Sequence, residues 1–214
     1  MNYDLILWDW NGTLLDDAAW CVEVTNRMLG HRGLPIMSME KYRQVFTFPV
    51  EEYYREIGFD LEAESFAALS VEFNGLYGGP DRTYTLRKGA RAVLQTIDAR
   101  GLPQAVLSAS EQNNLNRQMA EFGLTGYFAA VLGIEDIYAK SKMELGRRYM
   151  ARCGHSCVLL IGDTTHDWEV AQALGADCLL LAHGHQCREV LSGTGAAVAE
   201  GLEDVLTYVT ERAG

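Results

Sequence analysis

Acidic, hydroxyl and lysine side chains follow or precede short apolar runs at several places in the chain. Asp9 ends the run LILWD, Ser108 ends the run QAVLS, and Asp163 ends CVLLIGD, with Asp167 four residues later. Lys142 stands shortly before the last of these runs. Crowded carboxylates raise one another's pKa unless something positive lies near, and oxygen ligands suit Mg²⁺. These residues together predict a site built around a divalent, oxygen-preferring cation.

A parallel sheet would bring these residues to one edge. The apolar runs at 3–9, 103–109, 157–163 and 176–182 do not alternate with polar residues, which is typical of strands buried on both faces. A weaker run lies at 196–200, and predicted helices occupy 88–100, 111–122, 141–152, 165–174 and 201–211. The alternation indicates a Rossmann-like, doubly wound α/β fold, in which ligands bind at the carboxyl ends of the strands.

Residues 16–83 interrupt this alternation. Their pattern predicts helices at 16–30, 38–46, 49–57 and 61–77, separated by turns rich in Gly, Pro and Asp. We therefore expect a core domain formed by residues 1–15 and 84–214, with a helical domain of residues 16–83 inserted after the first strand.

Composition restricts the classes of partner. The chain carries 18 basic and 29 acidic residues, a formal charge of −11, which argues against nucleic-acid binding but permits a small anionic ligand beside a metal ion. No apolar stretch is long enough to span a bilayer, and the N-terminus has no basic, signal-like region. Five cysteines, an odd number, fit free thiols in a reducing compartment. We expect a cytoplasmic monomer or homodimer without a membrane partner.

The order and spacing of the site residues resemble those of the haloacid dehalogenase superfamily. The segment DWNGT at 9–13 resembles the first family motif, DxDGT, and GDTTHD at 162–167 resembles the fourth. Ser108 and Lys142 resemble the second and third motifs. The insert is similar to the helical cap of one group, and YRQVFTFPVEEYYREIGFD resembles the cap of phosphoglycolate-phosphatase-like members. The resemblance implies a phosphatase that hydrolyses a small phosphorylated metabolite.

The resemblance also implies a role for each motif residue. Asp9 is the expected nucleophile, which forms an aspartyl-phosphate intermediate. Lys142 is expected to neutralise the nucleophile and the transferring group; Lys140 competes for this role, but SKMELGRRYM places Lys142 where the family's helix usually begins. The implied Mg²⁺ ligands are Asp9, the backbone carbonyl of Asn11, Asp163 and Asp167, and the implied phosphate-binding residues are Ser108, Ala109, Gly12 and Lys142.

Asn11 departs from the family pattern, because the superfamily's phosphatases normally have an aspartate there as general acid and base. An amide donates a hydrogen bond but transfers no proton. Three explanations stay open. The protein is a phosphatase for a substrate with a good leaving group, or one with a substitute base, such as Asp16, Asp17 or a cap residue. It catalyses a related reaction that needs no acid there, as dehalogenases and phosphonoacetaldehyde hydrolases do, the latter requiring a cap lysine such as Lys41. Or it binds a phosphorylated metabolite with little turnover.

Cap residues are expected to select the substrate. In similar caps the region of Phe46 and Thr47, in the FTFP turn, faces the core site. Arg43 and Arg55 lie on predicted cap helices and are candidates to hold a substrate anion. On the core side, His183 and His185 follow a predicted strand, and we interpret them as loop histidines rather than catalytic ones.

Overall fold

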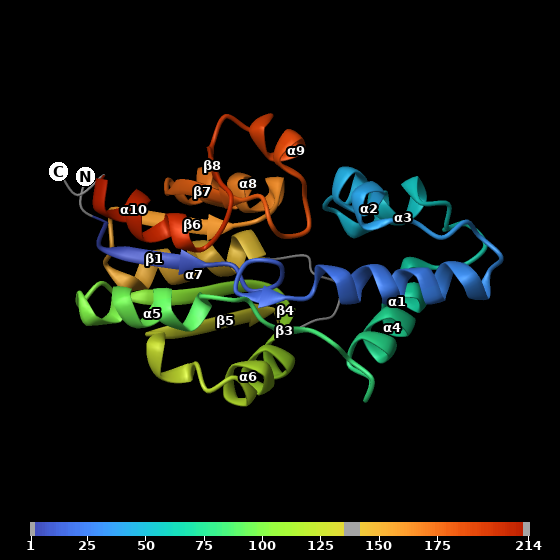
Figure 1. Cartoon of the computed structure of the whole chain (residues 1–214), viewed down its shortest axis with the longest axis horizontal. Coiled ribbons are helices and arrows are strands. Elements are labelled where there is room, and N and C mark those ends of the chain that lie inside the picture. The colour runs from blue at the N-terminus through green and yellow to red at the C-terminus, as the bar shows by residue number, and fades with distance from the viewer. Residues whose placement is uncertain (1–2, 135–141, 212–214) are drawn as a thin grey trace.

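A six-stranded parallel sheet forms the centre of the protein, as the computed structural model of residues 3–134 and 142–211 shows (Figure 1). The strand order is β5-β4-β1-β6-β7-β8, with every neighbouring pair parallel. The strands are β1 Leu5–Trp8, β4 Gln104–Glu111, β5 Ala130–Ile134, β6 Val158–Gly162, β7 Asp177–Leu181 and β8 Ala197–Ala199.

Both faces of the sheet are covered, which explains the unbroken apolar run of β1. Ile6 and Trp8 belong to one buried apolar cluster, together with Leu94 of α5. Leu5 and Leu7 belong to a second cluster on the other face, because successive strand residues point to opposite sides. The helices of this region are α5 Ala90–Ala99, α6 Gln112–Glu121, α7 Lys142–Cys153, α8 Thr165–Leu174, α9 Arg188–Ser192 and α10 Glu203–Glu211, with a 3₁₀ turn, η1, at Thr125–Tyr127.

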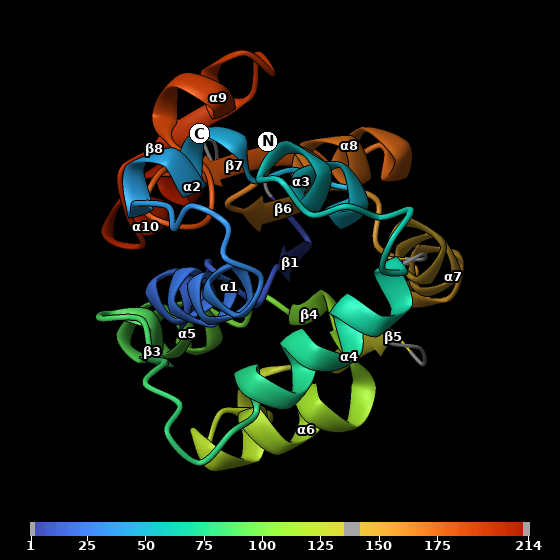
Figure 2. The ribbon, with the colours of Figure 1, turned by 90° about the vertical axis from the view of Figure 1, so that its right-hand side faces the viewer.

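Four helices lie beyond the carboxyl ends of the strands, and we call them the cap (Figure 1; Figure 2 views the molecule from the cap side). They are α1 Ala18–His31, α2 Met39–Val45, α3 Val50–Glu56 and α4 Phe66–Tyr77. The chain enters and leaves the cap through two short antiparallel strands, β2 Leu15–Asp16 and β3 Thr85–Leu86. The cap therefore stands over the edge of the sheet where the sequence places the candidate site.

The α/β fold is confirmed, although several elements differ locally from the prediction. Strand β5 was not predicted, although AAVLGI is an apolar run. It is an edge strand, and its first three residues are only half-buried. Helix α4 begins at Phe66 rather than at 61, and α9 was missed. Glu111 ends β4 and caps α6 through its carboxylate, so the helix begins one residue later than expected. Within the described residues, no helix is both long and apolar enough to cross a membrane.

Candidate active site

Lys142 joins two carboxylates at the carboxyl edge of the sheet. Asp9 follows β1, Asp167 lies in the first turn of α8, and Lys142 is the first residue of α7. The Lys142 Nζ lies 2.5 Å from Asp9 Oδ1 and 2.5 Å from Asp167 Oδ1. All three residues are buried. Burial alone would lower the pKa of Lys142, but Asp167 and Asp9 outweigh it and raise that pKa, so the lysine stays protonated.

Three carboxylates share this position. Asp9, Asp163 and Asp167 each offer an oxygen, and these oxygens lie within 4.8 Å of one another. Burial, Asp167 and Asp163 raise the pKa of Asp9 despite the opposing effect of Lys142. Burial is also the main cause that raises the pKa of Asp163 to about 6. One lysine does not balance three buried carboxylates, and a divalent cation with oxygen ligands fits this excess of negative charge.

Backbone and hydroxyl donors fix the orientation of the two acids from GDTTHD. Asp163 Oδ1 accepts from Thr13 Oγ1 at 3.1 Å, and Asp163 Oδ2 accepts from the backbone N–H of His185 at 2.6 Å. Asp167 Oδ2 accepts from Thr164 N at 2.9 Å and from Thr164 Oγ1 at 2.7 Å. Asp167 thereby keeps Oδ1 directed to Lys142.

Two glycines make room for Asp163. A Cβ on Gly12 would lie 2.1 Å from Asp163 Oδ2, and a Cβ on Gly184 would lie 2.0 Å from the same oxygen. Gly12 also has a φ of +74°, which favours glycine. Its predicted contribution to phosphate binding is not supported, because its N–H donates to Asp17 Oδ1 at 2.8 Å. Gly12 is needed for close approach to Asp163 and not as a phosphate donor.

The amide of Asn11 is fully occupied by protein groups. Its Nδ2 donates to Asp17 Oδ2 at 2.7 Å and to Tyr77 OH at 3.1 Å, and its Oδ1 accepts from Ser110 Oγ at 2.6 Å. The three partners come from the entry to α1, from the end of α4 and from β4. Asn11 therefore connects the loop after β1 to the cap, a structural function that the sequence did not reveal.

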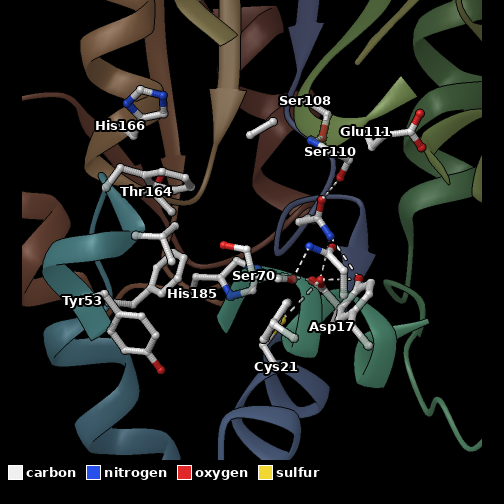
Figure 3. Close-up of a pocket in the computed structure, with 18 of the residues that line it drawn as sticks. Asp17, Cys21, Tyr53, Ser70, Ser108, Ser110, Glu111, Thr164, His166 and His185 are labelled. Atoms are coloured by element: carbon white, nitrogen blue, oxygen red, sulfur yellow. Dashed lines mark hydrogen bonds and ion pairs between the residues drawn. The ribbon is translucent and has the colours of Figure 1, made fainter. Parts of the chain in front are cut away.

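Asp17 and His185 form a buried ion pair beside this network. His185 Nε2 lies 3.3 Å from Asp17 Oδ1, and His185 Nδ1 lies 2.7 Å from the hydroxyl of Tyr42 (Figure 3). Burial opposes both charges, but the pair and its hydrogen bonds dominate, so the pKa of Asp17 is lowered and that of His185 is raised to about 9. Both ring nitrogens and both Asp17 oxygens are engaged, and Cys21 Sγ adds a contact of 3.7 Å to Asp17. Asp17 is thus held by donors and is not a free base.

Ser108 and Ala109 line a cavity of about 540 Å³ that also contains Asp9 and Lys142. Ser108 is buried, and its Oγ accepts from Ser110 N at 3.0 Å, which leaves its hydroxyl hydrogen to bind another acceptor. The cavity extends from these core residues into the cap, and Figure 3 shows Ser108 and Ser110 on the core side and Tyr53 on the cap side. Its volume suits a small molecule.

Of the four predicted specificity residues, one lines the cavity and three do not. Phe46 lines the cavity, whereas Thr47 and Arg55 do not, and Arg55 is exposed. Arg43 donates from Nε to Gly184 O and from Nη2 to His183 O, both at 2.9 Å, and so ties α2 to the loop after β7. The expectation that Arg43 and Arg55 clasp a substrate anion is therefore not supported.

Of the two other candidate lysines, Lys41 lies within the described residues. Lys41 is half-exposed on α2, with its Nζ 3.7 Å from Glu56 Oε1, and it does not line the cavity. A Schiff-base lysine in the cap is therefore not provided by Lys41. Lys140 lies outside the described residues. Asp16, an alternative base, is largely exposed and pairs with Arg87 at 3.0 Å.

Known proteins resemble the chain over most of its length. The sequence profile of the haloacid dehalogenase-like hydrolases matches residues 6–181. A phosphoglycolate phosphatase from Rhodobacter capsulatus is 26% identical over 188 residues, which cover 85% of each chain. The tyrosine-protein kinase PtkA of Mycobacterium tuberculosis is 23% identical over 91% of this chain and 67% of that protein. A haloacid dehalogenase-like hydrolase from Streptococcus pneumoniae has the same fold, with a TM-score of 0.81 at 16% identity over 96% of this chain and 98% of that one.

Proposed function

The chain belongs to the haloacid dehalogenase-like hydrolase family, and from this premise we propose that it is a Mg²⁺-dependent phosphatase of a small phosphorylated metabolite, with Asp9 as nucleophile. The phosphatase assignment is supported by the family and by the phosphoglycolate phosphatase from Rhodobacter capsulatus. The five free cysteines fit a cytoplasmic enzyme.

The observation that carries the proposal is the placement of Lys142 between Asp9 and Asp167. This lysine opposes the burial that raises the pKa of Asp9, and so favours the anionic form that a nucleophile needs. It also lies where it can stabilise charge on a transferring phosphoryl group. Ser108 donates its hydroxyl hydrogen to a phosphate oxygen. Asp9 then forms an oxygen–phosphorus bond as the ester oxygen leaves, and water later cleaves the aspartyl phosphate to inorganic phosphate.

Asp9, Asp163 and Asp167 are the side chains that would hold Mg²⁺, with the backbone carbonyl of Asn11 as the expected fourth protein ligand. The bound ion would reduce the repulsion between the anionic nucleophile and the anionic phosphate.

Asn11 takes no part in proton transfer. Its amide has no proton to give in this chemistry, and its hydrogens are donated to Asp17 and Tyr77. Asp17 does not replace it, because donors already hold both of its oxygens. The leaving oxygen is therefore protonated by water or by another group that lines the cavity.

Two alternative functions differ from this proposal in their requirements. A phosphonatase-like reaction needs a reactive cap lysine, and Lys41 does not line the cavity but pairs with Glu56. A dehalogenase does not need the acidic cluster that Asp163 and Asp167 complete. A binding protein with little turnover would keep the same site, so activity distinguishes it.

Phosphate release tests the proposal. We expect p-nitrophenyl phosphate and a panel of metabolite phosphates to be hydrolysed in the presence of Mg²⁺, and activity to disappear with EDTA or in the variant Asp9→Asn. Asp4→Asn, a change at an exposed N-terminal aspartate that binds Ser156 and Cys157, is the matched control and should retain activity. Release that is independent of both Mg²⁺ and Asp9 would contradict the proposal, and no release from any ester would favour the binding protein.

A further inference from the structure

The cavity that opens from Asp9 into the cap is walled by aromatic side chains. Phe46 and Phe48 lie in the loop between α2 and α3, and Tyr53 lies on α3. Phe66, Phe73 and Tyr77 line it from α4. The leaving group of a phosphate ester bound at Asp9 has to occupy this part of the cavity, because the phosphate itself lies against the core residues.

Ring contacts order one side of this cavity. The centroids of Phe46 and Tyr53 lie 5.2 Å apart, and those of Phe46 and Phe48 lie 5.5 Å apart, both edge to face. Phe48 also stacks on His166 of α8, with centroids 4.7 Å apart, which joins the aromatic wall to the core. Such an array is fixed in place and presents apolar surface and ring edges to a ligand.

The hydroxyl groups of three cavity tyrosines are already used. Tyr53 OH donates to Met37 Sδ at 3.7 Å, Tyr77 OH donates to Asp17 Oδ2 at 2.8 Å, and Tyr42 OH is bonded to His185. These residues therefore offer their rings rather than their oxygens to a ligand.

Positive charge is missing from the cap side. Among the described cap residues from α1 to α4 that line the cavity, none is charged. Arg43 is held by two backbone carbonyls, and Arg55 does not line the cavity.

On the core side the cations are either paired or at the surface. Lys142 is paired with Asp9 and Asp167. Arg117 is exposed and donates to Asn114 Oδ1 at 2.5 Å. Glu111 adds negative charge to this rim. A carboxylate on the leaving group would face uncharged ring surface on the cap side and the acidic Glu111 on the core side, and Arg117 offers a cation only from the exposed rim.

We propose that the preferred substrates are phosphate monoesters of uncharged alcohols that carry an aromatic or bulky apolar group, rather than phosphorylated hydroxy acids such as phosphoglycolate. The inference rests on the proposed phosphatase function and names its substrate class. Hydrolysis breaks the ester oxygen–phosphorus bond and releases the apolar alcohol together with inorganic phosphate, with water as the other reactant.

Esters with alkyl leaving groups test this without the bias of a reactive phenolate. We compare benzyl phosphate, glycerol 3-phosphate and phosphoglycolate with Mg²⁺ present. Burial of a phenyl ring predicts a kcat/KM for benzyl phosphate that is roughly ten- to a hundredfold higher than for the other two, expressed mainly in KM. Equal or better use of phosphoglycolate or glycerol 3-phosphate overturns the inference and leaves the phosphatase proposal intact. No hydrolysis of any ester, including p-nitrophenyl phosphate, overturns both.

Two variants of α4 place the same charge inside and outside the cavity. Phe73→Arg introduces a cation into the cavity wall and should lower kcat/KM for benzyl phosphate by about tenfold, while raising that for phosphoglycolate. Val71→Arg, at a position that is 60% exposed and outside the cavity, should change neither. Circular dichroism confirms that both variants fold. A folded Phe73→Arg enzyme with an unchanged KM for benzyl phosphate would overturn the inference.

Discussion

Asn11 donates a hydrogen bond of 2.7 Å to Asp17, and this contact explains why an amide suits position 11 in this chain. Asp17 is buried and keeps a lowered pKa through His185, Asn11 and Tyr77 despite its burial. A second carboxylate at position 11 would lie against the first. Position 11 therefore carries an amide rather than an acid because its side chain donates to the buried carboxylate of Asp17.

The variant Asn11→Asp should lower stability instead of restoring a family-like acid. It replaces a donor to a buried carboxylate by a second carboxyl group, and we expect a loss of roughly 2 kcal/mol or more in the free energy of unfolding. Urea denaturation at neutral pH measures this change, and steady-state assays should show no gain in kcat. A variant that is as stable as wild type and faster in turnover would show that the Asn11–Asp17 contact does not determine the choice of residue.

Removal of the Asp17 charge should lower the free energy of unfolding more than Asn11→Asp does. Asp17→Asn leaves the protonated ring of His185 buried without its counter-ion, and a broken buried pair typically costs about 3–5 kcal/mol. Asp16→Asn is the matched control, because Asp16 is largely exposed and its pair with Arg87 should contribute at most about 1 kcal/mol. Thermal or urea unfolding of both variants provides the comparison. Equal losses in the two would contradict the ion-pair interpretation.

Gly184 should be intolerant of a methyl group because Asp163 fills the space beside it. A Cβ there would lie 2.0 Å from Asp163 Oδ2, so Gly184→Ala has to displace this acid. A displacement on the order of 1 Å costs up to about a hundredfold in rate, and we expect the Mg²⁺ concentration for half-maximal activity to rise. Gly30→Ala, in α1 with open space around the added atom, should leave activity unchanged. Normal Mg²⁺ dependence in Gly184→Ala would refute the steric argument.

Low pH should weaken the ion pairs that Arg32, at the end of α1, forms with Glu64 and with Glu72 of α4. Arg32 binds Glu64 at 2.7 Å and Glu72 at 2.6 Å, and these contacts lower the pKa of both carboxyls below 4.5. Groups with a lowered folded-state pKa stabilise above the unfolded value, and this contribution is lost as the pH falls through the folded pKa. Arg32→Met should therefore destabilise by about 1 kcal/mol at pH 7 and by less as the pH falls below about 4.5. A destabilisation that is constant with pH would exclude this linkage.

Much of the fold and part of the site followed from local sequence. The run LILWD predicted β1 because unbroken apolar residues fit a strand buried on both faces, and Lys142 was placed at the start of its helix. The pairing of Asp17 with His185 left no local signal, because it depends on how α1 packs against the loop after β7. For the same reason the sequence did not show that Gly12 N–H binds Asp17 or that Arg43 binds backbone carbonyls. The aromatic cavity likewise requires residues from separate cap helices.

Acid-quenched single turnover tests the central claim, that Asp9 is phosphorylated. Enzyme in excess over a hydrolysed ester is quenched within milliseconds to seconds, digested and analysed by mass spectrometry. The account predicts a transient phosphoryl group on the peptide that contains Asp9, formed only with Mg²⁺ and absent in Asp9→Asn. Phosphate release at full rate without a phosphorylated peptide, or phosphorylation of a different residue, would contradict it.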